Sequence, residues 1–337
     1  MLSIPVRFYS LLILVAALTA DASPLFEEDS TLDVSLTGPL ATLLDANDDT
    51  REFPFILQAG ATEQPIQVRV RGKSRKRVCD FTPLRFDFPT DAMEGTAFAD
   101  LSKLKFVSHC SDDEASQINA IEEYGVYKIF AVLSDASYKV RLLHVTYTDT
   151  DARLKEASFT RYGFVVEPSS ALAARISATK VDAQGVVLSK LNPQQAATVY
   201  VFQYLVGNTD WSLVMANEDD KCCHNGDLFA AGDEIYLVPY DFDLVGLVNA
   251  RYAKPDPTLR ISSVTQRRYR GYCIDTGVLK EAVIAIKARK EEILNVIRSL
   301  PLLTQKDKAS RLKYLEGFFA AAEDEDRLVK SFDRKCL

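Results

Sequence analysis

Three short stretches decide the fold and the chemistry of this chain: "NTDWS" (208–212), "CCHNGDLF" (222–229) and "PYDFDLVG" (239–246). The first and the last each begin where an apolar run stops, so each places carboxylates at the end of a helix or a strand. The middle stretch adds a histidine and an asparagine. A short part of the chain therefore gathers five side chains of the types that bind metals or move protons: Asp210, His224, Asn225, Asp241 and Asp243.

These side chains fit the acidic half of a phosphoryl-transfer site. Magnesium binds through one or two carboxylates and substrate phosphates, and it keeps several waters. Phosphoryl transfer needs such a metal, a carboxylate that orients the attacking hydroxyl, and a lysine on the phosphates. Asp210 after a helix and Asp241 after a strand are the candidate carboxylates, while Asn225 and Asp243 are candidate further metal ligands.

The basic half of such a site is found earlier in the chain. The stretch "LSKLKFVSHC" alternates as a strand and carries two lysines, of which Lys105 is the candidate for the phosphates and Lys103 the alternative. A helix predicted over 111–134 then offers Glu122 or Glu123 to brace that lysine. Glu123 is preferred because it lies next to the apolar stripe of the helix rather than in it.

The pattern of elements divides the chain into a strand-rich half and a helical half. Several runs before Pro168 alternate with period two, with one capped helix among them. After Pro168 a helix starts at Asn192, with proline at its first position, and two long amphipathic helices follow over 278–300 and 309–332. We therefore predict an α+β, two-lobed fold, with an extended lead-in at 23–52, an N-lobe at 53–167 and a C-lobe at 168–337.

Residues 1–22 are predicted to be a signal peptide. Arg7 precedes an apolar run over 8–20, which is shorter than the roughly 20 residues of a membrane span, and Ala20-Asp21-Ala22 resembles a small-residue cleavage site. No later run is long and apolar enough to span a bilayer. We expect a secreted or periplasmic protein after cleavage near Ala22. Its net charge of −7 argues against a nucleic-acid partner.

Six cysteines in an exported chain favour disulfides over metal ligands. Cys79 and Cys110 both lie in or beside strand-like runs of the N-terminal part, so we predict that they pair. Cys273 is expected to pair with Cys222 or Cys223, and Cys336 with the other of those two.

The order of these parts resembles the CotH-type (spore-coat protein H-like) kinase family, an atypical branch of the protein-kinase fold. The motifs that carry the resemblance cover roughly Phe53 to Tyr252. They are "VRVRGKS", "KLKFVSHC", "EEYGVYKIF", "YGFVVEP", "YLVGNTDWS", "HNGDLF" and "VPYDFDLVG". The most specific of them are the closing ones: a helix that ends in Asn-x-Asp, then His-Asn, then Pro-aromatic-Asp.

The resemblance implies a role for each candidate residue. Asp210 would stand in the catalytic loop, Asp241 would bind the metal, and Lys105 would form an ion pair with Glu123. Glu167 would lie at the hinge between the lobes, beside the nucleotide base. The implied cofactors are ATP with Mg²⁺ or Mn²⁺, and the implied acceptor is a hydroxyl on an exported protein or surface component.

The chain departs from ordinary kinases because it has neither a glycine-rich phosphate loop nor His-Arg-Asp. A basic run, of which Arg71 is the member we assign to the nucleotide, is a candidate cover for the phosphates; a solvated hairpin face is its simplest alternative. His109 and His144 are expected to be structural. The run is Arg69, Arg71, Lys73, Arg75, Lys76 and Arg77.

Other functions fit the same residues. A kinase fold that has lost its chemistry would be a module for envelope or surface assembly, indifferent to loss of Asp210. A related enzyme would transfer a nucleotidyl or other group instead of phosphate. An exported adhesion protein that binds calcium through the aspartate-rich loops would bind metal without nucleotide and would lose stability without Asp241.

Overall fold

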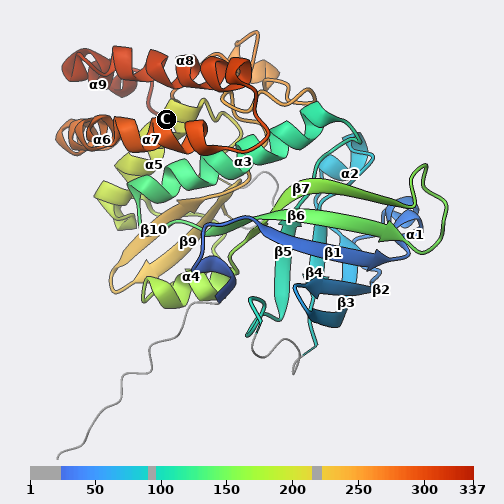
Figure 1. Cartoon of the computed structure of the whole chain (residues 1–337). Coiled ribbons are helices and arrows are strands. Elements are labelled where there is room, and N and C mark those ends of the chain that lie inside the picture. The colour runs from blue at the N-terminus through green and yellow to red at the C-terminus, as the bar shows by residue number, and fades with distance from the viewer. Residues whose placement is uncertain (1–23, 90–95, 215–221) are drawn as a thin grey trace, which may run out of the picture.

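The computed structural model of the protein describes residues 24–89, 96–214 and 222–337 (Figure 1). Its first part is a closed barrel of seven strands in the order β1-β2-β3-β4-β5-β7-β6. The strands are β1 (Leu32–Gly38), β2 (Phe53–Ala59), β3 (Thr62–Val70), β4 (Leu84–Asp87), β5 (Lys103–Val107), β6 (Val140–Asp149) and β7 (Ser158–Val166).

The barrel closes through β1, which lies parallel to β6 and antiparallel to β2. Alternation along this strand buries Val34 and Leu36 in the barrel, and α1 (Leu40–Ala46) follows directly. Residues 32–38, within the segment expected to be an extended lead-in (23–52), therefore form a strand of the barrel. The pattern of β1 is too short to stand out in the sequence, and its partner β6 lies a hundred residues away, so the pairing is a tertiary effect.

Helix α3 (Glu114–Leu133), which the sequence predicted over 111–134, connects the barrel to the rest of the molecule. Asp113 caps it, since its carboxylate accepts a hydrogen bond from the Ser116 N–H at 2.8 Å. The helix packs against β6 and β7 on one side and against α7 on the other (Figure 1). Gly125 in its middle allows this contact, because a Cβ there would lie 2.9 Å from Leu300 Cδ1.

The second part of the chain begins with a three-stranded sheet and helix α5. Asn192 caps α5 and Pro193 stands at its first position, while Gly207 ends it in a left-handed conformation with φ 70°. Asp210 therefore follows the helix closely. The sheet has the order β10-β9-β8, and these elements are α4 (Ser169–Arg175), β8 (Thr179–Val181), α5 (Pro193–Val206), β9 (Gly226–Ala231) and β10 (Glu234–Pro239).

Four helices complete the described chain where the sequence predicted two. The longer predicted helices are interrupted at Arg289 and at Asp324, and the Asp324 carboxylate caps the next helix through the Arg327 N–H. Because an aspartate inside a helix can equally cap a new one, periodicity alone does not separate them. The helices are α6 (Thr276–Ala288), α7 (Lys290–Ser299), α8 (Gln305–Ala321) and α9 (Glu325–Asp333). Short helical turns are η1 (Pro24–Phe26), α2 (Arg75–Val78), η2 (Leu188–Lys190) and η3 (Pro257–Leu259).

Two hydrophobic clusters fill this architecture. One is the barrel interior, around residues such as Leu36, Phe86 and Phe106. The other combines α3 with the helices and the sheet of the second part. The first half is thus strands around one core, but its single long helix belongs to the second core. The proposed lobe boundary at residue 167 remains a prediction.

Three disulfides are present. Cys79–Cys110 forms as predicted. The other predicted pairings are wrong, because Cys222 bonds to its neighbour Cys223 and Cys273 bonds to Cys336. The C-terminus runs back along residues 271–273, with Leu337 N–H donating to Gly271 O at 3.1 Å, which places Cys336 beside Cys273.

The predicted signal peptide, residues 1–22, lies outside the described residues. Within the described ranges, no helix combines the length and the apolar character that crossing a membrane requires.

Gly163 on β7 gives a direct test of the barrel packing. A Cβ there would meet Phe106 Cζ at 2.3 Å and Val107 O at 2.7 Å, and the second of these is backbone. We expect Gly163→Ala to lower the free energy of unfolding by about 1–3 kcal/mol through overpacking. Gly185→Ala, at an exposed position with no atom within 4 Å of the new Cβ, is the control. Urea unfolding of both variants measures the difference; equal stability would contradict the packing described here.

Candidate functional site

One cavity of about 590 Å³ brings together most of the predicted site residues. This volume lies within the range of small-molecule sites. Its walls come from the connection between β3 and β4, from β5, and from the loops after α5 and β10. The lining side chains are Arg71, Lys73, Ser74, Arg77, Lys105, Asp210, Cys223, His224, Asn225, Tyr240, Asp241 and Leu244.

Of the eight residues predicted for the site, five line this cavity: Asp210, Lys105, Arg71, Asp241 and Asn225. The structure thus places in one cavity the residues predicted to act as the base, to bind the metal and to contact the phosphates. The other three, Glu123, Asp243 and Glu167, lie outside the lining.

Asp210 is held by two neighbours in the sequence stretch that follows it. Its Oδ1 lies 3.0 Å from His224 Nε2, and its Oδ2 accepts from Asn225 Nδ2 at 2.9 Å. Asn225 Nδ2 also donates to the Asp210 carbonyl at 2.7 Å. The Asp210 side chain is still 38% exposed. Each carboxylate oxygen has more than one lone-pair site, so Asp210 can accept a further proton donor from the cavity.

Asn225 and Asp241 share an uncommon backbone conformation. Their φ angles are 53° and 62°, in the left-handed region where asparagine and aspartate are tolerated better than most residues. The two loops are joined, because the Tyr240 N–H donates to Asn225 O at 3.2 Å. The Asp241 N–H donates to the Tyr127 hydroxyl of α3 at 2.9 Å. Left-handed residues held by surrounding contacts gather at functional sites.

The expected ion pair between Lys105 and Glu123 does not form. Glu123 is buried and pairs with Arg75, with Nη1 to Oε2 at 3.6 Å. Arg75 lies on α2, in the basic run, and neither it nor Glu123 lines the cavity. The prediction failed because a strand lysine and a helix glutamate do not reveal in sequence which way each side chain points.

Asp243 is buried beside this pair and not in the cavity. Its Oδ2 accepts a hydrogen bond from the Tyr252 hydroxyl at 3.0 Å. Burial, together with the neighbouring charge of Asp241, raises the pKa of Asp243 to about 7. Burial and the Asp243 charge also raise the pKa of Glu123 well above its ordinary value. The role of Asp243 as a metal ligand remains a prediction.

Lys105 opens onto the cavity. Its Nζ lies 5.5 Å from the centre of the Tyr240 ring, a cation–π distance, and it makes no ion pair with any residue in the described part of the chain. Although the side chain is exposed to the cavity, the surrounding protein removes hydration from its ammonium, which lowers the pKa of Lys105; Arg71 lowers it further. Its charge is available to an anionic ligand.

The basic run divides in three directions. Arg69 donates a hydrogen bond to the Asp49 carbonyl, and Lys76 forms an ion pair with the Asp49 carboxylate. Arg75 is buried and pairs with Glu123. Arg71, Lys73 and Arg77 face the cavity. Three of the six members of the run thus line the cavity, which the sequence did not distinguish.

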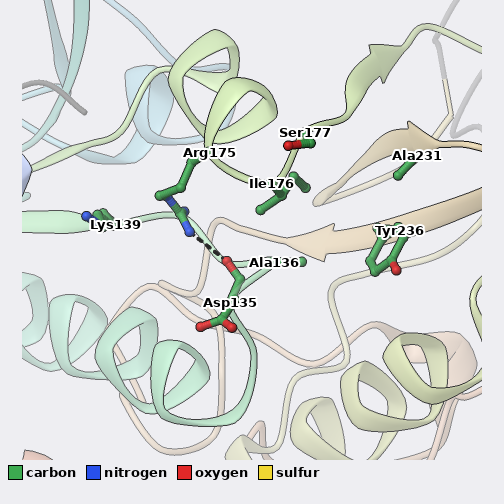
Figure 2. Close-up of a pocket in the computed structure, with 8 residues that line it drawn as sticks. All are labelled: Asp135, Ala136, Lys139, Arg175, Ile176, Ser177, Ala231 and Tyr236. Atoms are coloured by element: carbon green, nitrogen blue, oxygen red, sulfur yellow. Dashed lines mark hydrogen bonds between the residues drawn. The ribbon is translucent and has the colours of Figure 1, made fainter. Parts of the chain in front are cut away.

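Glu167 follows β7, but its carboxylate is already used. It accepts from Arg175 Nε at 3.1 Å, from Arg175 Nη2 at 2.9 Å and from the Lys139 N–H at 3.0 Å. Its partners Lys139 and Arg175 line a second cavity of about 590 Å³ (Figure 2). There Arg175 also binds the Asp135 carbonyl at 2.7 Å, so its guanidinium is occupied. A contact from the Glu167 side chain to a nucleotide base would have to displace these bonds.

The structure gives the histidines different roles. The sequence assigned His224 no role in the site, yet its Nε2 lies 3.0 Å from Asp210 Oδ1; its place next to Asn225 was the available clue. His109 is buried against Phe81, with ring centroids 4.4 Å apart, and burial lowers its pKa to about 3. His144 lies 2.9 Å from Asp33 on the barrel surface.

The residues present fit a divalent metal that keeps water and phosphate ligands. The described residues contain no group of three or more His, Cys, Asp or Glu side chains arranged as a complete metal site. Magnesium does not need one, since it is held by one or two carboxylates plus substrate phosphates. Asn225 uses its Nδ2 on Asp210, which leaves its side-chain oxygen as a metal ligand in the cavity that Asp241 also lines. Asp241 and Asn225 are the residues that would hold the ion.

No protein-family model matches the chain, and no curated protein matches it. Two solved structures are similar in outline. The Helicobacter pylori proinflammatory kinase CtkA has a TM-score of 0.38 at 10% identity, over 83% of this chain and 92% of that chain. A chain of the Shewanella oneidensis MR-1 toxin–antitoxin complex of HipA, HipB and operator DNA has a TM-score of 0.36 at 13% identity, over 84% of this chain and 66% of that one. Likenesses this low carry no argument about function.

The contact between His224 and Asp210 predicts a pH dependence. The hydrogen bond that His224 Nε2 donates to the Asp210 carboxylate raises the pKa of His224 above its ordinary value of 6.5. Because the folded pKa is the higher one, protonated His224 stabilises the fold fully below about pH 6.5, and this contribution is lost as the pH rises through the folded pKa. Asp210→Asn should lower the pKa of His224.

Proton NMR titration of the imidazole resonances measures this pKa. The chain has three histidines, of which His109 does not titrate in this range, and His144 is the internal control. A His224 titration curve that is the same in both proteins would show that the contact is absent in solution.

Proposed function

We propose that the protein is a metal-dependent phosphotransferase that moves phosphate from ATP to a hydroxyl, and that it is a CotH-like kinase. The observation that carries this proposal is the single cavity in which Asp210, Asn225 and Asp241 face Arg71 and Lys105. Phosphoryl transfer depends on positioning and charge, and these are the side-chain types it requires.

The order of the elements supports the same function. In protein kinases a loop over the phosphates, a strand lysine, a helix glutamate, a catalytic aspartate, an asparagine and a metal-binding aspartate follow one another. This chain has the β3–β4 connection, Lys105 on β5, Glu123 on α3, and then Asp210, Asn225 and Asp241. The neighbouring strands run β3-β4-β5-β7-β6, with α3 inserted between β5 and β6. The closure of the barrel by β1 and β2 is an addition of this chain.

In the proposed reaction Asp210 orients the acceptor hydroxyl. The hydroxyl oxygen attacks the terminal phosphorus, the bond from that phosphorus to ADP breaks, and Asp210 accepts the hydroxyl proton. His224 and Asn225 keep the Asp210 carboxylate in place. A divalent ion bound at Asp241 and Asn225 would neutralise phosphate charge. Lys105 and Arg71 contact the remaining phosphate oxygens.

The acceptor is proposed to be an exported protein or surface component. All six cysteines are paired in disulfides, which persist in oxidising compartments. The signal-like residues 1–22 agree with export, and they leave a secreted or periplasmic chain.

ATP with Mg²⁺ or Mn²⁺ should stabilise the oxidised protein against heat. Ligand at about 100 times its Kd adds about 2.7 kcal/mol to the free energy of unfolding. We expect this shift in Tm to need both metal and nucleotide, and to disappear in Asp241→Ala because that carboxylate would hold the ion. Asp233→Ala, on the exposed turn between β9 and β10, is the matched control.

The same experiment separates the alternatives. Stabilisation by Ca²⁺ alone, lost in Asp241→Ala, would favour the adhesion protein. No shift with any metal or nucleotide would favour the assembly module and would end the enzymatic proposal. If ATP and metal do stabilise the protein, transfer of γ-³²P from ATP to exported proteins is the next measurement.

A further inference from the structure

The connection between β3 and β4 is fixed to the protein through Arg75. This connection, residues 71–83, carries Arg71, Lys73 and Arg77 on the cavity side. Arg75 is not among the lining residues and is 7% exposed, although it stands in the middle of the basic run. A buried arginine in such a run needs partners, because an unpaired buried charge is strongly unfavourable.

The partners of Arg75 come from two other elements. Nη2 donates to Ser108 O at 2.6 Å, just after β5, and Nη1 lies 3.6 Å from Glu123 Oε2 on α3. The guanidinium also lies 6.0 Å from the centre of the Tyr252 ring. One side chain thus joins the β3–β4 connection to the strand that carries Lys105 and to the helix behind Asp241.

The surroundings of Arg75 are acidic. Glu123 and Asp243 are buried, and Asp241 is near enough that its charge acts on Arg75. No second cation pairs with Glu123 in the described part of the chain. Arg75 is therefore the cation that offsets charge in this buried acidic group.

A covalent link supports the same connection. The Cys79–Cys110 disulfide joins the residue after α2 to the segment before α3. Cys79 N–H donates to Arg75 O at 2.9 Å, and Cys110 N–H donates to Ser116 Oγ at 2.8 Å. The connection is tied to the start of α3 at one point and to its middle at another.

We propose that Arg75 is a positioning residue, which fixes residues 71–83 against β5 and α3 so that Arg71 and Arg77 are preorganised over the cavity. The identity of the ligand, a nucleoside triphosphate with its metal, rests on the proposed function. The arrangement differs from the expected one, since the cation paired with Glu123 comes from the phosphate-covering connection and not from Lys105. Preorganised contacts bind more tightly because less ordering is lost on binding.

The test compares Arg75→Lys and Arg75→Met with the neighbouring control Lys76→Met. Lysine keeps the charge but lacks the planar fork that reaches Ser108 O and Glu123 together, so Arg75→Lys should fold. Lys76 stands on the same short helix and pairs with the half-exposed Asp49. Hydrogen–deuterium exchange of residues 71–83 is measured first, without any ligand.

We expect about 10- to 100-fold faster exchange of residues 71–83 in Arg75→Lys than in the wild type or in Lys76→Met. With ATP and Mn²⁺, KM for ATP should rise by about 10- to 100-fold, the range expected when binding groups are misplaced, while kcat changes less. Unchanged exchange in Arg75→Lys would overturn the proposal whatever the protein binds. If the wild type does not bind ATP, the proposed function is wrong. The exchange rates of residues 71–83 would still test the positioning role of Arg75.

The disulfide gives an independent second comparison. Cys79→Ala with Cys110→Ala should also speed exchange in residues 71–83 and weaken ATP binding. Cys273→Ala with Cys336→Ala removes a disulfide at the C-terminus and should leave exchange in 71–83 as in the wild type. Equal effects of the two double variants on residues 71–83 would indicate general loss of stability and would contradict the role assigned to this connection.

Discussion

Two adjacent buried carboxylates on α3 constrain the whole molecule. Glu122 and Glu123 are 1% and 2% exposed, and each finds an arginine from a distant part of the chain. Glu122 Oε1 accepts from Arg311 of α8 at 2.6 Å, and Glu123 pairs with Arg75 of α2. Removing one partner of a buried pair costs about 3–5 kcal/mol, because the other charge is left unpaired. If helix α3 moved away from the helical half or from the β3–β4 connection, one of these buried charges would lose its partner.

The position of the site follows from this constraint. Tyr127 stands one turn along α3 from Glu123, and its hydroxyl accepts the Asp241 N–H. Phe242 then packs edge-on against Tyr127, with centroids 4.7 Å apart, and against Phe202 of α5. Phe242 is thus buried, while its neighbour Asp241, whose backbone is left-handed, lines the cavity. The same helix thus anchors the phosphate-covering connection and the candidate metal-binding loop.

Local signals predicted much of this arrangement. Asn192 with Pro193, and Gly207 at the other end, define α5 and so place Asp210, while Asp113 defines the start of α3. Which side chains meet across the structure could not be predicted in the same way. The barrel depends on β1 pairing with β6, the partner of Glu123 depends on which cation turns inward, and Cys222 had two equally plausible distant partners. Asp241 and Asp243, two residues apart, differ only in which of them faces the cavity. These outcomes depend on tertiary packing, which single residues and their spacing do not encode.

The charge distribution in the cavity bears on the kind of ligand. Arg71, Lys73, Arg77 and Lys105 line it together with only two carboxylates, Asp210 and Asp241. The nearby Arg71 already lowers the pKa of Lys105, so these cations are crowded. A bare calcium ion would add positive charge to that crowd, and its usual six to eight oxygen ligands are not available from two carboxylates and an amide. A polyphosphate with its metal would bring net negative charge to these four cations. Its metal would lie at Asp241 and Asn225. The electrostatics of the cavity therefore favour the nucleotide over the calcium ion as the ligand of this site.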